Sequence, residues 1–208
     1  MSGLRKLRGL YAVTPDDALT PRLSALVAEA LAGGVRLVQY RNKGAPSALR
    51  RAQAADLLRL CRASDALLIV NDDLELAVEI NADGVHLGRD DGDIDSARAA
   101  LGLQKILGVS CYADLDRAAA AAQAGADYLA FGSVYASATK PHAPPAPLAL
   151  LGEARRRFGL PIAAIGGIAL DNAAQTIAAG ADLLAVVSDL FDAADIAARA
   201  REYTRLFT

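Results

Sequence analysis

The stretch Ala124-Gly125-Ala126-Asp127-Tyr128-Leu129-Ala130-Phe131 joins a helix stop to an apolar run, and its first four residues recur as Ala179-Gly180-Ala181-Asp182. Glycine ends a helix at little cost because it readily takes the left-handed conformation. The short apolar run that follows is typical of a buried parallel strand. Glycine also stands before apolar runs in residues 32–34 and 81–84. The chain is therefore interpreted as a repeated βα unit.

Eight such units follow one another along the chain. We predict strands at residues 10–13, 36–41, 66–71, 84–87, 105–110, 128–131, 161–165 and 183–187. We predict helices at residues 19–32, 47–63, 73–80, 94–101, 114–124, 148–158, 172–179 and 192–206. Short carboxylates that can accept first-turn N–H groups mark helix starts at Asp73, Asp114, Asp171 and Asp192.

Eight parallel units that close on themselves predict the α/β class and a single-domain (β/α)8 TIM barrel over residues 1–208. The alternative is an open doubly wound sheet, which usually carries Gly-x-Gly-x-x-Gly after its first strand. This chain has Thr14-Pro15-Asp16 there. A length of 208 residues, 53% hydrophobic and 22% charged, fits one domain.

Charge and cysteine content narrow the function classes. A formal net charge of −2 gives no overall basic field, so neither nucleic acid nor an anionic membrane is an expected partner. Cys61 and Cys111 lack the spacing of a disulfide framework or a metal site, and a reduced, cytoplasmic protein is expected. The apolar residues 10–13 are too short for a signal peptide or a membrane span.

Polar residues follow the second, third and fourth predicted strands, and in a parallel barrel these strand ends share one rim. Gln39 and Arg41 lie on one strand face, with Lys43 just beyond, and such clustered cations favour an anion with several oxygens between them. Asp72 and Asp91 follow adjacent strands and form a plausible pair for Mg²⁺, which shares phosphate oxygens with a substrate.

A second anion site is predicted where Gly166-Gly167 and Val187-Ser188 follow the last two strands, the usual phosphate-binding position in (β/α)8 enzymes. The long connection from Gly132 to Pro147, which contains Lys140, is interpreted as a lid over the site. Two anion sites on one rim predict a reaction that joins two phosphorylated molecules, one of which loses diphosphate.

No side-chain nucleophile is evident. His86 is interpreted as a hydrogen-bonded residue of a barrel layer rather than an acid or base, and with His142 as the other histidine no zinc site is expected. Ser110 could donate a hydrogen bond to substrate, but no triad partner accompanies it. Cys111 is interpreted as a small buried residue.

Together these strand ends resemble the thiamine-phosphate synthase family over almost the whole chain. The matching motifs are Leu10-Tyr11-Ala12-Val13-Thr14, Val38-Gln39-Tyr40-Arg41-Asn42-Lys43, Asn71-Asp72, Ala82-Asp83-Gly84-Val85-His86-Leu87-Gly88, Gly108-Val109-Ser110, Thr139-Lys140, Ala164-Ile165-Gly166-Gly167-Ile168 and Val186-Val187-Ser188. The resemblance implies a transferase that couples 4-amino-2-methyl-5-(diphosphooxymethyl)pyrimidine to a carboxylated thiazole phosphate. The products are thiamine monophosphate, diphosphate and carbon dioxide, and diphosphate leaves before the thiazole nitrogen attacks.

The resemblance also implies residue roles. The implied pyrimidine-diphosphate contacts are Gln39, Tyr40, Arg41, Asn42, Lys43, Asn71, Ser110 and Lys140, of which Arg41, Lys43, Ser110 and Lys140 would stabilise the leaving group. The implied thiazole-phosphate contacts are Ser137, Ala138, Thr139, Gly167, Val187 and Ser188. The implied Mg²⁺ ligands are Asp72 and Asp91, although the run Arg89-Asp90-Asp91 leaves Asp90 as an alternative.

Three other functions are alternatives to this transferase. A thiazole tautomerase would share the fold and the phosphate end but needs neither a metal nor a diphosphate clamp. A catalytically silent phosphate sensor has no use for such a clamp, and a tryptophan-pathway aldose-phosphate enzyme would leave the N-terminal motifs unexplained. The expected partners are small-molecule substrates; the sequence leaves the oligomeric state open, and a homo-oligomer is compatible with it.

Overall fold

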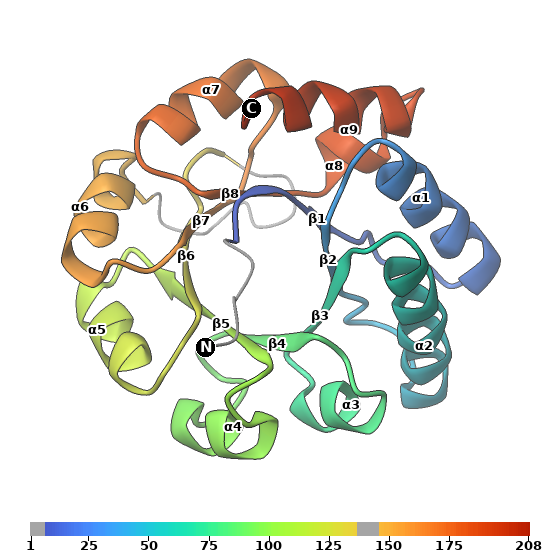
Figure 1. The fold of residues 1–208 in the computed structure, drawn as a ribbon, viewed down its shortest axis with the longest axis horizontal. Coiled ribbons are helices and arrows are strands. Elements are labelled where there is room, and N and C mark those ends of the chain that lie inside the picture. Colours follow the sequence, from blue (N-terminus) through green and yellow to red (C-terminus); the bar gives the residue numbers. More distant parts are fainter. Residues whose placement is uncertain (1–6, 137–145) are drawn as a thin grey trace.

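The computed structural model describes residues 7–136 and 146–208, and these form a closed barrel of eight parallel strands. The strands are β1 (Gly9–Val13), β2 (Leu37–Tyr40), β3 (Leu67–Asn71), β4 (Gly84–Leu87), β5 (Ile106–Tyr112), β6 (Tyr128–Gly132), β7 (Ile162–Ile165) and β8 (Leu183–Val186). Each strand pairs with the next in sequence, and β8 pairs with β1 to close the ring (Figure 1). The predicted TIM barrel is confirmed, and the open sheet is excluded.

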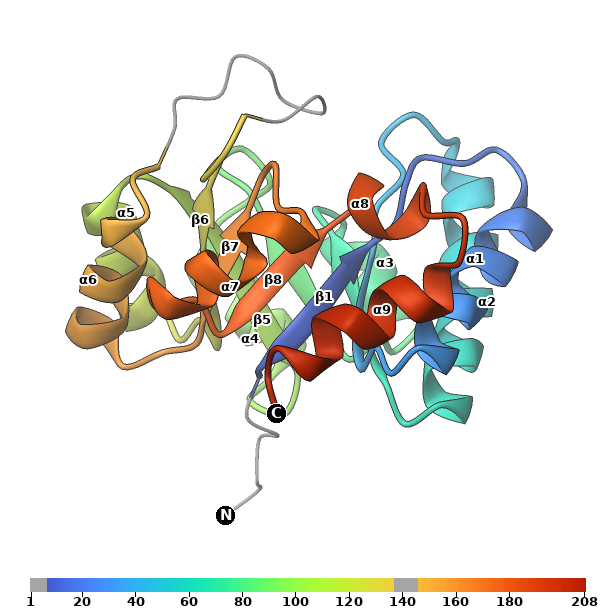
Figure 2. The same ribbon diagram turned by 90° about the horizontal axis from the view of Figure 1, so that it is seen from above.

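Helices surround the ring on its outside, as Figures 1 and 2 show from two directions. In the described part of the chain they are α1 (Thr20–Ala32), α2 (Ser47–Ala63), α3 (Leu74–Glu79), α4 (Ile94–Leu101), α5 (Leu115–Gln123), α6 (Ala149–Phe158), α7 (Leu170–Ala178), α8 (Ser188–Phe191) and α9 (Ile196–Arg205). The predicted caps Asp73 and Asp114 do accept first-turn N–H groups.

Two predicted helix starts are wrong. The helix predicted at 192–206 is instead a short α8 and a separate α9, with Asp192 at the end of α8 and Asp195 capping α9 through the N–H of Ala198. Asp171 lies in the first turn of α7, where the Asn172 side chain accepts the Ala169 N–H. In both places a neighbouring polar side chain competes for the cap, which a helical pattern alone does not resolve.

Alternating strand side chains fill two separate cores, one inside the ring and one between the ring and the helices. On β2, for example, Leu37 belongs to the inner core and Val38 to the outer one. The inner core also holds two fully buried tyrosines, Tyr11 of β1 and Tyr128 of β6. This alternation decides which strand residues can reach the inside of the barrel.

The glycines before strands serve two different purposes. Gly125 and Gly180 have φ values of +86° and +120°, which confirms their predicted left-handed turns. In residues 81–84, however, Asn81 takes the left-handed conformation, with φ of 55°. Gly84 is the first residue of β4, and a Cβ there would overlap the carbonyl of Ile106. There glycine allows close approach of two strands rather than a helix stop.

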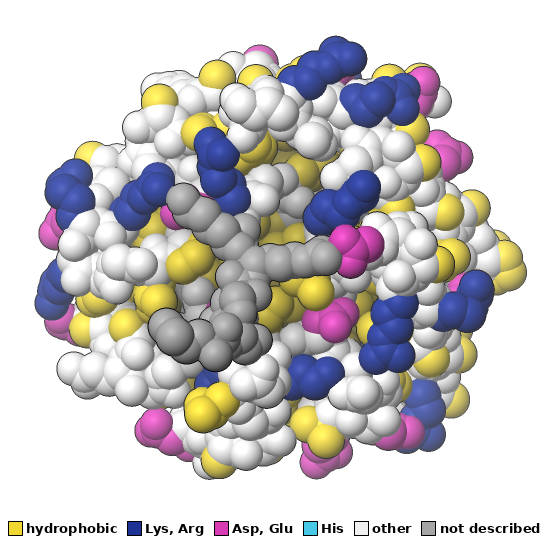
Figure 3. Space-filling view, viewed as in Figure 1, with side chains coloured by type: hydrophobic (Ala, Val, Ile, Leu, Met, Phe, Trp, Pro, Cys, Tyr) yellow, Lys and Arg dark blue, Asp and Glu magenta, His cyan; other side chains and the backbone are white. Residues whose placement is uncertain are grey.

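Surface charge is mixed in sign. On the face seen in Figure 3, acidic and basic side chains are interspersed around the centre. Among the helices of residues 7–136 and 146–208, none has both the length and the apolar character that a membrane crossing requires. Both cysteines are free and buried, as expected for Cys111.

Candidate active site

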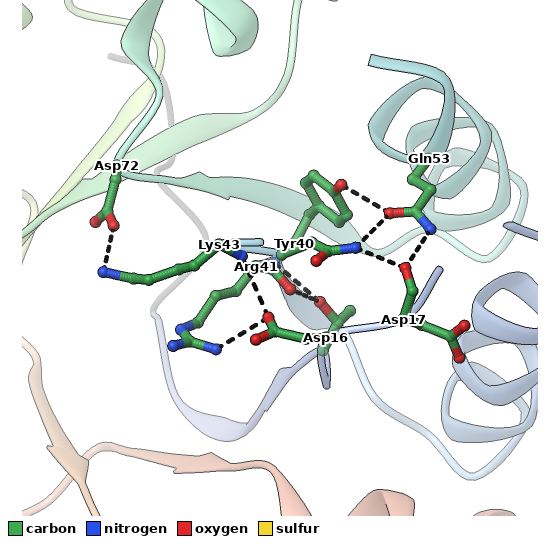
Figure 4. Close-up of polar contacts among 9 residues, drawn as sticks. Asp16, Asp17, Tyr40, Arg41, Lys43, Gln53 and Asp72 are labelled. Carbon is green, nitrogen blue, oxygen red and sulfur yellow. Dashed lines mark hydrogen bonds and ion pairs between the residues drawn. The ribbon is translucent and has the colours of Figure 1, made fainter. Parts of the chain in front are cut away.

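The connection after β1 holds the basic end of β2 in place (Figure 4). The Thr14 hydroxyl donates to the Arg41 carbonyl and accepts the Arg41 N–H, both at 2.9 Å. Asp16 Oδ1 lies 3.2 Å from Arg41 Nη1 and also accepts the Lys43 N–H at 3.2 Å. Asp16 thus contacts the guanidinium of Arg41 and the backbone of Lys43. This role of Asp16 was not predicted from the sequence, because only the fold brings the ends of β1 and β2 together.

Tyr40 and Asn42, two residues that the resemblance places on substrate, are tied to a buried scaffold outside β2 (Figure 4). Gln53 of α2 accepts hydrogen bonds from the Tyr40 hydroxyl at 2.8 Å and from Asn42 Nδ2 at 2.9 Å. Asn42 and Gln53 both donate to the Asp17 carbonyl, at 2.7 and 2.9 Å. Burial raises the pKa of Tyr40 to about 12. These side chains fix the loop that carries Arg41 and Lys43.

Asp72 and Asp91 face each other across the ends of β3 and β4. Asp72 has φ of 64°, a left-handed conformation that aspartate tolerates better than most residues, and its N–H donates to the His86 carbonyl at 2.8 Å. Lys43 Nζ lies 2.9 Å from Asp72 Oδ2 (Figure 4). The Gly88 N–H donates to Asp91 Oδ2 at 2.8 Å, and a Cβ at Gly88 would overlap that oxygen.

The two carboxyl groups titrate unequally because they are close together. Burial and the hydrogen bond and negative charge of Asp72 raise the pKa of Asp91. Burial acts to raise the pKa of Asp72 as well, but its hydrogen bonds to Asp91 and Lys43 outweigh burial and lower it. The pair therefore favours a further positive charge or a shared proton between its oxygens.

The donor set at these strand ends fits a hard divalent cation that keeps water and substrate oxygens among its ligands. Asp90 is exposed, so Asp91 is the residue of that run that faces Asp72. Among residues 7–136 and 146–208, no group of three or more histidine, cysteine or carboxylate side chains forms a metal cage. Mg²⁺ commonly takes one or two carboxylates and completes its shell with water and substrate phosphate. Asp72 and Asp91 can supply those two carboxylates.

A chain of hydrogen bonds crosses the inside of the barrel and was not predicted. Gln39 Nε2 donates to the Tyr11 hydroxyl at 2.7 Å, and the Tyr11 and Tyr128 hydroxyls are 2.7 Å apart. The Tyr128 hydroxyl lies 2.8 Å from His86 Nδ1, and His86 Nε2 lies 2.8 Å from Ser110 Oγ. The interpretation of His86 as a hydrogen-bonded barrel-layer residue is confirmed. Successive side chains of a strand point to opposite faces, and this alternation along β1 and β6 could have predicted that both tyrosines point into the barrel.

The ends of β7 and β8 lie at the same rim because all strands are parallel. Gly166 and Gly167 have φ values of +92° and +62°. A Cβ on either would overlap the start of the β6–α6 connection, at Ser133 and at Ala136 respectively. The exposed Ser188 begins α8, a helix of four residues after the eighth strand, where phosphate-binding (β/α)8 enzymes often carry a short extra helix.

Part of the predicted site lies outside the described residues. These positions are Ser137, Ala138, Thr139 and Lys140, together with most of the connection interpreted as a lid. The described start of that connection packs on the β7 turn, since the Val134 N–H donates to the Ile165 carbonyl at 2.9 Å and the Tyr135 N–H to the Gly166 carbonyl at 3.2 Å.

The fold and rim define the class of the protein: a (β/α)8 barrel whose strand ends combine basic side chains, a carboxylate pair and glycine turns, a set suited to phosphorylated substrates. The family model described as thiamine monophosphate synthase matches residues 10–190. The chain belongs to this family, as its sequence motifs indicated.

Relatives support the assignment over nearly the full length. The chain is 58% identical over 202 residues to the thiamine-phosphate synthase of Aromatoleum aromaticum, covering 97% of each chain. It is 57% identical over 196 residues to that of Chromobacterium violaceum, covering 94% of each. The solved structure of thiamine phosphate pyrophosphorylase from Pyrococcus furiosus superposes with a TM-score of 0.87 at 34% identity, covering 99% of this chain and 98% of that one.

Proposed function

We propose that this chain makes thiamine monophosphate by condensing 4-amino-2-methyl-5-(diphosphooxymethyl)pyrimidine with a carboxylated thiazole phosphate, releasing diphosphate and carbon dioxide. The observation that carries this function is the meeting, on one rim, of a basic and carboxylate cluster after β2, β3 and β4 with the glycine turn and short helix after β7 and β8. The near full-length similarity to thiamine-phosphate synthases supports the same reaction.

The pyrimidine diphosphate is assigned to the rim above β2, β3 and β5. Arg41 and Lys43 supply positive charge, and Asp16 accepts hydrogen bonds from the Arg41 guanidinium and from the Lys43 backbone N–H. Gln39 reaches inward from β2. Asn71 is the last residue of β3, and the half-buried Ser110 lies near the end of β5. Arg41, Lys43, Ser110 and Lys140 are proposed to stabilise the leaving diphosphate, whose negative charge grows as the bond breaks.

Asp72 and Asp91 are the proposed Mg²⁺ ligands. The ion, when bound, would neutralise charge on the diphosphate oxygens. The chain's own part is to hold two carboxylates face to face, through the left-handed turn at Asp72 and the Gly88 N–H on Asp91. Lys43 stays within ion-pair distance of Asp72, so the lysine and the carboxylates can contact the same diphosphate.

The thiazole phosphate is assigned to Gly167, Val187 and Ser188, with Ser137, Ala138 and Thr139 from the β6–α6 connection. The first N–H groups of a helix have no partners within it, and α8 begins at Ser188 beside the rim. This seat lies across the ring from Asp72 and Asp91, since β7 and β8 are separated from β3 and β4 by other strands on both sides.

The reaction needs no nucleophile from the protein. The methylene carbon–oxygen bond breaks and diphosphate leaves with the electron pair, while the aminopyrimidine stabilises the cation that remains. The thiazole nitrogen then forms the new carbon–nitrogen bond, and the carboxyl group departs as carbon dioxide. Holding two substrates on one rim supplies the alignment that this bond requires.

The tautomerase alternative leaves the carboxylate pair and the Lys43–Asp72 contact without a purpose.

We also propose that the enzyme works in the cytoplasm on small-molecule substrates, with its two buried cysteines as thiols.

The direct test is diphosphate release by the purified protein. With both substrates and Mg²⁺ present, we expect equal amounts of diphosphate and thiamine monophosphate, and no turnover in excess chelator. Full turnover without a divalent cation would remove the metal from the proposal. Proton exchange on the thiazole without any coupling would instead favour the tautomerase.

A further inference from the structure

The hydrogen-bond network that runs from the Gln39 side chain to the Ser110 side chain links residues of five strands, β1, β2, β4, β5 and β6. It consists of four hydrogen bonds of 2.7 to 2.8 Å. Both ends reach residues assigned to substrate in the proposed function. The middle members Tyr11, Tyr128 and His86 are all buried. Burial raises the pKa of both phenols well above the usual range, so both hydroxyls keep their protons.

Which group donates and which accepts in each hydrogen bond of this network follows from the number of hydroxyl and amide protons. Gln39 Nε2 donates to Tyr11, whose hydroxyl has Gln39 and Tyr128 as its partners among the described residues. If Tyr128 donated to Tyr11, the Tyr11 proton would be buried without an acceptor, at a cost comparable to a lost hydrogen bond. Tyr11 therefore donates to Tyr128, and Tyr128 donates to His86 Nδ1.

These donor and acceptor roles decide which nitrogen of His86 carries the proton and whether Ser110 Oγ accepts a hydrogen bond from it. With Nδ1 as acceptor, the neutral imidazole carries its proton on Nε2 and donates to Ser110 Oγ. Ser110 Oγ then accepts a hydrogen bond from His86, and the serine hydroxyl proton is left to bond another acceptor. Such a donor suits an anionic oxygen of a leaving group.

Glycine makes room for the central member of this chain. A Cβ at Gly108 of β5 would overlap the ring carbons and the hydroxyl of Tyr128. The Tyr128 ring stacks on His86, with centroids 5.6 Å apart and an interplanar angle of 23°. It meets Tyr11 edge-on, at 5.8 Å and 86°. The Gly108-Val109-Ser110 motif therefore provides both the space for Tyr128 and the hydroxyl at the chain's end.

We propose that Tyr128, supported by Tyr11, is a positioning residue for the reaction: it holds His86 as the Nε2–H tautomer so that Ser110 donates to the diphosphate. This inference rests on the proposed function for the identity of the acceptor. Neither tyrosine is proposed to touch the reacting atoms.

The first experiment reads the tautomer without substrate. The chain has two histidines, so His142→Gln leaves His86 as the one imidazole in a ¹⁵N NMR spectrum. We expect Nε2 protonated and Nδ1 unprotonated, and loss of that preference in Tyr128→Phe. The opposite tautomer in the unsubstituted network would overturn the proposal, whatever the protein's activity.

The second experiment is a double-mutant cycle on diphosphate release. Tyr128→Phe is expected to lower kcat by about 10- to 100-fold, the worth of a charge-assisted hydrogen bond, with little change in KM. In a Ser110→Ala background the same change should have almost no further effect. Equal losses in both backgrounds would contradict the proposal, since a structural role would not depend on Ser110.

Tyr11→Phe removes the hydroxyl that donates to Tyr128 but leaves the Tyr128 bond to His86. Because Tyr11 only supports Tyr128, we expect this variant to weaken the Nε2–H preference and to lower kcat by less than Tyr128→Phe does. If it loses as much activity as Tyr128→Phe at equal melting temperature, the assigned role of Tyr128 is wrong. If the unsubstituted protein releases no diphosphate, the proposed function is wrong. The tautomer measurement needs no substrate, so it tests the positioning role separately from the proposed function.

Discussion

Exchanging Lys43 for methionine should reduce turnover far more than stability. Lys43 Nζ lies 2.9 Å from Asp72 Oδ2, but 53% of its side chain is exposed. Such a pair contributes under about 1 kcal/mol to folding, or a few degrees in Tm for a chain of this size. A preorganised donor to developing negative charge is worth about 3 to 4 kcal/mol, which is about 10²- to 10³-fold in kcat.

The assay is diphosphate release at saturating substrates, together with a thermal melt of each variant. Lys105→Met is the matched control, because the Lys105 Nζ donates to the Ala82 carbonyl at 2.6 Å near the opposite end of the barrel. We expect this control to keep its turnover. Near-normal turnover of Lys43→Met would refute the leaving-group role, as would a melting-temperature loss large enough to explain the fall in activity.

Three further predictions, two for substitutions and one for cysteine labelling, test other parts of the structure. Asp91→Asn should raise the Mg²⁺ concentration needed for half-maximal rate without changing the KM for the thiazole phosphate; an unchanged Mg²⁺ dependence would argue against Asp91 as a ligand. Gln53→Leu should destabilise the fold by about 1 to 3 kcal/mol in urea titration, because Tyr40 and Asn42 lose a buried acceptor. Burial raises the pKa of Cys61 and Cys111 to about 12, so both thiols stay protonated as the pH rises through 8 and 9. Iodoacetamide should therefore label the unfolded chain but not the native one, and rapid native labelling would contradict this burial.

Much of the fold was predictable because it depends on local pattern. Apolar runs and glycine stops located all eight strands, and the strand order followed from their parallel repetition. The segment after β8 was not predictable in detail, because its break between α8 and α9 depends on Asp195 capping a new helix. At Gly84 the local signal pointed to a turn, whereas packing against Ile106 decided the need for glycine.

The site was predictable only where residues follow a strand end. Asp72, Asp91 and Lys43 were placed together by the barrel topology, and the structure brings them together. Asp16 and Gln53 were missed because they act through contacts between the β1 connection, α2 and the end of β2. Tyr11 and Tyr128 look like ordinary strand residues, and only the closed ring brings their hydroxyls within 2.7 Å.

The central claim is that one rim of the barrel holds two phosphorylated ligands at once. A crystal structure with thiamine monophosphate, diphosphate and Mg²⁺ tests it most directly. We expect diphosphate against Arg41 and Lys43, the ion between Asp72 and Asp91, and the thiamine phosphate group at Gly167 and Ser188. Diphosphate bound at the other end of the barrel, or both phosphate groups competing for one seat, would contradict the account.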